Sequence, residues 1–98
     1  MATFKELGDK LEPRLKGMSN FKIGKTGQEI RDRYNQGYSD QYDFYEEIGY
    51  SKIAKTIDYF EEYLISRFIN FKNCDNDQIG GGEMEYSEKY IVYLMYNK

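Results

Sequence analysis

Apolar side chains repeat every three or four residues near the N-terminus, which is the spacing of one face of an α-helix. Phe4, Leu7, Leu11 and Leu15 share this face. Pro13 interrupts the pattern, and a proline disfavours helical geometry in the residue before it. We therefore expect a short N-terminal helix that ends or bends near Leu11.

A second, longer helical pattern begins at Ser51. Its apolar positions are again three and four residues apart: Ile53, Ile57, Phe60, Leu64, Ile65 and Phe68. This sustained spacing predicts a long amphipathic helix over about residues 51–70.

Three other segments suit strands, because they alternate or are rich in β-branched and aromatic side chains. They are FKI (21–23), YDFYEEIGYS (42–51) and KYIVYLMYNK (89–98). Phe21 and Ile23 would share one face of the first strand. The last run is apolar and short enough to be a buried strand.

The residues after the first strand predict a short helix from about Gln28 to Asn35. Thr26 is its candidate N-cap, since a threonine hydroxyl can accept a hydrogen bond from a free N–H of the first turn. Glu29 lies in that turn, beside the positive end of the helix dipole. Gly37 is expected to end the helix.

The segment NCDNDQIGGGE, residues 73–83, is predicted to be a loop because of its three consecutive glycines. No repeat or linker divides the chain, so residues 1–98 are expected to form a single domain. The expected fold class is α+β: a small antiparallel sheet of about three strands, made by the segments above, packed against helices and covered by the 51–70 helix.

Composition narrows the possible functions. The chain has 98 residues, a net charge of -3 and a pI near 5.0, so binding to nucleic acid through bulk charge is not expected. It has no histidine, which removes the usual zinc ligand and neutral-pH base. Cys74 is the single cysteine and fits a reducing cytoplasm. With no signal-like or membrane-length apolar segment, we expect a soluble cytoplasmic protein without a membrane partner.

Two features could form a binding surface. The chain has 11 tyrosines, which could fill a core margin or stack on bases, and composition does not separate these alternatives. Residues 21–26 read FKIGKT and lead into a helix with two arginines. Such a junction can present basic side chains to phosphate, here Lys22, Lys25, Arg31 and Arg33. Alternatively, it can be a turn that only connects the strand to the helix.

Three separated pieces of the chain resemble the GIY-YIG nuclease superfamily. KIGKT, then a helix containing RDRY, then a helix reading IDYFEEYLISRF, occur in the order of the small phage-type branch whose second strand reads KIG. The resemblance covers roughly residues 21–73. It implies a GIY-YIG-like fold and hydrolysis of a DNA phosphodiester by a tyrosine, a helix arginine and a metal-binding glutamate.

The resemblance assigns roles to particular residues. The strand glycine is Gly24, and the arginine is Arg33, with Arg31 as the alternative. The metal ligand is Glu61, because Leu64, Ile65 and Phe68 follow it at the family's spacing, whereas Glu62 fits that spacing less well. A lone carboxylate that leaves water on the metal is typical of Mg²⁺, which is the cofactor implied for an active enzyme.

The family's two strand tyrosines are not at their expected places. The position in the second strand is Lys22, and the sequence before KIG is helix and loop. KYIVYLMYNK resembles the missing first strand, as if the domain were circularly permuted, and Tyr90 or Tyr93 would then supply the tyrosine.

Two functions therefore stay open. One is a metal-dependent DNA endonuclease. The other, favoured by the misplaced tyrosines, is a catalytically degenerate domain that binds DNA or a nucleic-acid-binding protein complex, as a phage-encoded inhibitor of a host defence complex would. For the second, an acidic surface could face a basic groove of the partner; its candidate residues are Asp40, Asp43, Glu46, Glu47 and Glu61.

Overall fold

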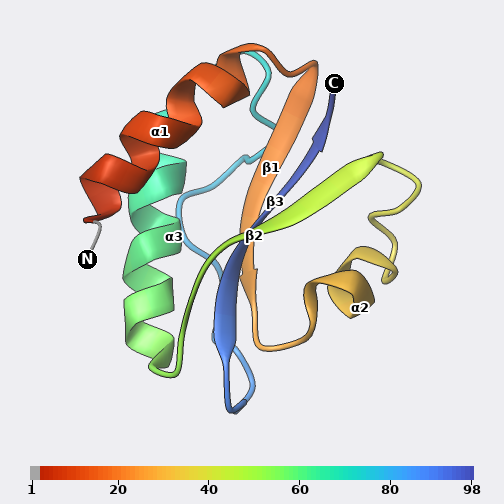
Figure 1. The fold of residues 1–98 in the computed structure, drawn as a ribbon. Coiled ribbons are helices and arrows are strands. Elements are labelled where there is room, and N and C mark those ends of the chain that lie inside the picture. The colour runs from red at the N-terminus through yellow and green to blue at the C-terminus, as the bar shows by residue number, and fades with distance from the viewer. Residues whose placement is uncertain (1–2) are drawn as a thin grey trace.

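A computed structural model describes residues 3–98 of the chain (Figure 1). Helices and strands alternate along it: α1 (Phe4–Lys16), β1 (Asn20–Thr26), α2 (Ile30–Tyr34), β2 (Phe44–Ser51), α3 (Ala54–Phe68) and β3 (Tyr90–Asn97). The three strands form one antiparallel sheet, and helices pack on it, which confirms the predicted α+β class. Within residues 3–98, no helix has the length and apolar character needed to cross a membrane.

The C-terminal strand β3 lies in the centre of the sheet, in the order β1-β3-β2. Its first six residues are all buried, on both faces of the sheet. This explains why the KYIVYLMYNK segment is apolar without alternation: each successive side chain enters one of two cores.

The two faces of the sheet carry different cores. On one face, α1 and α3 pack side by side over Phe21, Val92 and Leu94 (Figure 1). On the other face, α2 and the turn after it cover Tyr93 and Met95. Tyrosines dominate this second, smaller core, so at least part of the tyrosine content serves packing.

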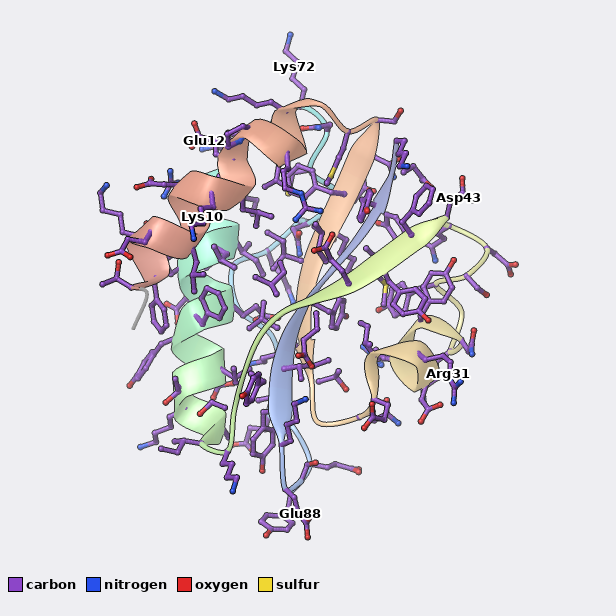
Figure 2. The ribbon with its side chains drawn as sticks, viewed as in Figure 1. Lys10, Glu12, Arg31, Asp43, Lys72 and Glu88 are labelled. Carbon is purple, nitrogen blue, oxygen red and sulfur yellow. The ribbon has the colours of Figure 1, made fainter. Side chains whose placement is uncertain are left out.

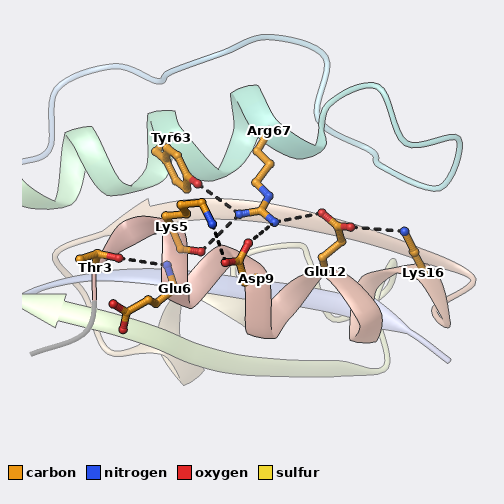
Figure 3. Close-up of polar contacts among 8 residues, drawn as sticks. All are labelled: Thr3, Lys5, Glu6, Asp9, Glu12, Lys16, Tyr63 and Arg67. Atoms are coloured by element: carbon orange, nitrogen blue, oxygen red, sulfur yellow. Dashed lines mark hydrogen bonds and ion pairs between the residues drawn. The ribbon is translucent and has the colours of Figure 1, made fainter.

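The N-terminal helix does not end near Leu11, as its proline predicts, but continues through Pro13 to Lys16. Leu15, beyond the proline, is fully buried in the core. Arg67 of α3 also binds α1 ahead of the proline, with Nη2 at 2.7 Å from an Asp9 oxygen and 3.1 Å from a Glu12 oxygen (Figure 3). These tertiary contacts outweigh the one helical hydrogen bond that the proline removes.

The predicted helix at residues 28–35 is also corrected, because α2 is shorter and begins at Ile30. Thr26 is not its N-cap but the last residue of β1, where its hydroxyl accepts a hydrogen bond from the Gln28 N–H at 3.1 Å. Glu29 occupies the N-cap position without a side-chain cap. The Thr26 hydroxyl therefore closes the turn between strand and helix.

The outer edge of β1 is covered over only part of its length. Phe21 exchanges backbone hydrogen bonds with the Asn73–Asp75 segment. The Asn76 side chain then accepts from the Ile23 N–H and donates to the Ile23 carbonyl, each at 2.9 Å. This cover stops at Ile23, so the rest of β1 borders a hollow.

Candidate functional site

The hollow at the edge of β1 brings together residues from several parts of the chain. Its volume is about 320 Å³. Gly24 and Lys25 of β1, Arg33 of α2, Glu61 of α3 and Tyr93 of β3 all line it. Since β1 is an edge strand, groups from both faces of the sheet can meet here, which is how α2 and α3 contribute to one site.

Gly24 makes room for the phenol of Tyr93, its partner across the β1–β3 ladder. A Cβ atom at Gly24 would lie 2.7 Å from Tyr93 Cε1 and still closer to Cζ and Oη. A glycine at this place therefore lets the tyrosine hydroxyl cross β1 toward the hollow. Burial raises the pKa of Tyr93, and the neighbouring Arg33 cation opposes that rise only in part, so the hydroxyl is protonated at neutral pH.

Arg33 brings a positive charge to the same place. Burial lowers the pKa of Arg33, but the oxygens of Tyr93 and Tyr38 raise it by more, so the guanidinium stays charged. Its Nε–H is buried and has no hydrogen-bond partner. Among residues 3–98, Arg33 forms no salt bridge, so its charge is available to an anion.

Glu61 brings a buried carboxylate. Its side chain is 6% exposed, and its Oε1 accepts no hydrogen bond. Burial raises the pKa of Glu61, although the Lys25 ammonium, 3.9 Å from Oε1, acts in the opposite direction. Lys25 is mainly bound elsewhere, at 2.7 Å from Asp58. An acceptor left unpaired in this way costs stability and commonly marks a functional position.

Any metal ion at this hollow would have few protein ligands. Within the described part of the chain, no group of three acidic, histidine or cysteine side chains is arranged to hold a metal. Glu61 would be the candidate ligand, because its buried Oε1 accepts no hydrogen bond, and water and substrate oxygens would be the other ligands. The Lys25 ammonium competes for that oxygen.

Lys22 and Tyr38 also line the hollow. Lys22 Nζ and Arg33 Cζ each lie 5.3 Å from the centre of the Tyr38 ring. Sequence analysis did not select Tyr38. The one sequence feature that marks Tyr38 is its position next to the turn glycine Gly37, which does not indicate a binding role. Tyr38 lies at the site because the turn folds back toward it.

Two of the predicted site residues lie elsewhere. Arg31 is exposed and points into solvent from α2 (Figure 2). Tyr90 is buried on the α3 face of the sheet, where its hydroxyl accepts a hydrogen bond from the Ser87 N–H at 3.0 Å. Tyr90 and Tyr93 are three residues apart in one strand, so they face opposite sides, and only Tyr93 reaches the hollow.

The acidic surface considered for protein binding does not form as a unit. Glu61 is buried at the hollow, so it cannot belong to an exposed patch. Glu46 forms a salt bridge with Arg14, and Glu47 lies 3.2 Å from Lys89. Much of the negative charge on β2 is thus paired within the chain.

The segment between Asn76 and Ser87 covers the hollow. Asp77, Gly81 and Glu83 are among its lining residues. A second hollow of about 400 Å³ lies against the same segment and shares Lys25 and Arg33 with the first. Acidic side chains of this segment thus border the place where positive charge is concentrated.

No protein-family model, curated protein or solved structure matches this chain.

Proposed function

We propose that the protein is a metal-dependent nuclease that hydrolyses a phosphodiester of DNA at the hollow beside β1. The observation that carries this proposal is the meeting of Arg33, Glu61 and the Tyr93 phenol in one 320 Å³ hollow. They come from three elements far apart in sequence. A guanidinium N–H and a carboxylate oxygen, both buried and without a hydrogen bond, favour a site built for groups that the chain does not supply.

Binding of the phosphate follows from the charges. Lys22 and Arg33 line the hollow, and neither forms a salt bridge within residues 3–98. A forked guanidinium suits phosphate oxygens, and its charge favours the extra negative charge of the transition state. Binding is expected to weaken steeply with salt, because phosphate contacts release counterions.

Hydrolysis uses the remaining two groups. The protonated Tyr93 hydroxyl orients a water, whose oxygen bonds to phosphorus while the bond from phosphorus to one ester oxygen breaks. The attacking water gives one proton to the Tyr93 oxygen while that hydroxyl passes its own proton to solvent water, and the departing oxygen takes a proton from solvent water. When bound at Glu61, magnesium supplies positive charge for the developing charge on phosphate. In the buried surroundings of Glu61 that charge would be screened less than in water.

The permuted form of the GIY-YIG resemblance stays part of this proposal. The C-terminal strand lies beside the KIG strand, and its Tyr93 is paired with Gly24. A tyrosine that is missing before KIG in the sequence would then be supplied by the other end of the chain.

The test is cleavage of supercoiled and linear DNA by the purified protein with Mg²⁺ or Mn²⁺. Arg33→Ala, Glu61→Gln and Tyr93→Phe should each lower the rate, by roughly 10² to 10³ for a single preorganised charge. The chain offers a matched control for each: Arg31→Ala, Glu62→Gln and Tyr90→Phe. The controls should cut at the wild-type rate.

Equal losses in a variant and its control would contradict the assignment, since they would indicate damage to the fold. Wild-type protein that cuts no faster than a mock preparation would refute the nuclease.

A second candidate is DNA binding without hydrolysis. The observation that favours it is the Lys25 ammonium, which lies 3.9 Å from Glu61 Oε1 and competes with a metal there. In that case DNA should bind equally well in EDTA and in Mg²⁺, Arg33→Ala should weaken binding, and no condition should give cleavage.

A further inference from the structure

Tyr38 has no role in the chemistry described above, yet it contacts both unpaired cations of the site. Lys22 Nζ and Arg33 Cζ lie 5.3 Å from its ring centre, and Arg33 Nη2 lies 3.5 Å from its hydroxyl oxygen. Two like charges so close to one ring repel each other, and the negative face of the ring offsets part of that repulsion.

The turn that carries Tyr38 is well anchored. The Tyr38 N–H donates to the Tyr34 carbonyl at 3.1 Å, and its own carbonyl accepts from the Tyr42 N–H at 2.9 Å. Gly37, just before it, has a φ of 109°, a backbone conformation that residues other than glycine rarely adopt. The backbone that carries the ring is therefore fixed, and the Tyr38 side chain packs against the second core.

Other cations near the site are held differently. Lys25 is bound to a carboxylate, and its charge is largely neutralised. An aromatic ring holds a cation without neutralising it, so Lys22 and Arg33 keep their full charge for a ligand. A ring is the suitable partner where charge must be both fixed in position and available.

We propose that Tyr38 is a positioning residue that holds Lys22 and Arg33 together so that both bind one phosphate group of DNA. This rests on the proposed function. The ring does the positioning, and its hydroxyl contributes little, because the contact to Arg33 is long for a hydrogen bond.

The experiment measures binding of a short mixed-sequence DNA duplex in EDTA, where hydrolysis cannot occur. Tyr38→Leu should weaken binding roughly tenfold, the effect of losing a partly desolvated cation–π contact. Tyr38→Phe should restore most of the affinity because it keeps the ring. Tyr50→Leu is the matched control: Lys89 lies 4.7 Å from the Tyr50 ring centre, but Tyr50 is 68% exposed and outside the site, so binding should not change.

Salt dependence separates positioning from loss of charge. Tyr38→Leu should leave the slope of log affinity against log salt near the wild-type value, whereas Lys22→Ala should reduce it by about one. Ring-current shifts of the Lys22 and Arg33 side-chain protons, measured by NMR on the free protein, should disappear in Tyr38→Leu and persist in Tyr38→Phe.

Three results would overturn the proposal: unchanged binding by Tyr38→Leu, equal loss in the Phe and Leu variants, or absent ring-current shifts in the wild type. These differ from failure of the nuclease, in which wild-type protein would bind DNA in EDTA but not cut it with metal.

Discussion

Replacing Gly24 by alanine tests the geometry on which the candidate site depends. Gly24 and Tyr93 are partners across the β1–β3 ladder, and the phenol occupies the space where a Cβ would stand. Tyr93 is 2% exposed, with the second core packed around it. One added methyl group must therefore displace either the ring or the strand.

The expected magnitude combines two opposing effects. Overpacking in a filled core costs about 1–3 kcal/mol. Alanine in the middle of a strand is favoured over glycine by roughly 0.5–1 kcal/mol, because glycine loses more backbone freedom on folding. The net loss in the free energy of unfolding should be about 0–2.5 kcal/mol. Cleavage should fall as well, since the displaced hydroxyl no longer reaches the hollow.

A double-mutant cycle assigns the cause. Tyr93→Leu removes Cε1, Cζ and Oη, the three atoms that a Cβ at Gly24 would meet. In that background the strand preference alone remains, so Gly24→Ala should raise stability by roughly 0.5–1 kcal/mol. Urea denaturation of the four proteins, followed by circular dichroism, measures the cycle.

The decisive observation is a change of sign between the two backgrounds. If Gly24→Ala destabilises the Tyr93→Leu variant as much as the wild type, the alanine does not act through the phenol. The proposed path of the Tyr93 hydroxyl to the hollow would then be wrong.

Two further predictions concern pH. Burial raises the pKa of Glu61 from its ordinary value of 4.5, so ionisation of this carboxyl destabilises the folded state as the pH rises above that value. In urea denaturation, Glu61→Gln should therefore be more stable than wild type at neutral pH and equal to it below about pH 4.5. The exposed control Glu62→Gln should show no such difference. Hydrogen bonds from Arg67 lower the pKa values of Asp9 and Glu12 below their ordinary values of 3.8 and 4.5. The pairs of these carboxylates with Arg67 therefore stabilise the fold above those pH values, and this stabilisation is lost as the pH falls. The stability lost in Arg67→Met should then shrink below about pH 4, and a pH-independent loss would contradict the role of these pairs.

Much of the fold followed from the order of apolar and polar residues. The stripe from Ile53 to Phe68 predicted α3, because a helix long enough to cover a sheet must repeat its apolar face every three or four residues. The apolar run at the C-terminus predicted a buried strand for a related reason: a strand covered on both faces has no polar side.

Helix ends followed less well, because they depend on contacts that local sequence does not contain. The proline rule alone ends α1 near Leu11, but buried Leu15 and the Arg67 contacts keep the helix going past Pro13. Thr26 reads as a helix cap, yet pairing with β3 places it in a strand. In both cases the free energy of tertiary packing exceeded a local preference of modest size.

The candidate site shows the same division. The family resemblance of the sequence pointed to Glu61 and to Arg33, with Arg31 as the alternative. It left Tyr90 and Tyr93 as alternatives, because a strand without polar alternation does not reveal which side each tyrosine faces. Only the tertiary structure placed β3 between β1 and β2, turned Tyr93 across Gly24 and brought Tyr38 to the two cations. Pairing the two ends of the chain depends on the burial of whole faces, a property of the assembled sheet that no short segment carries.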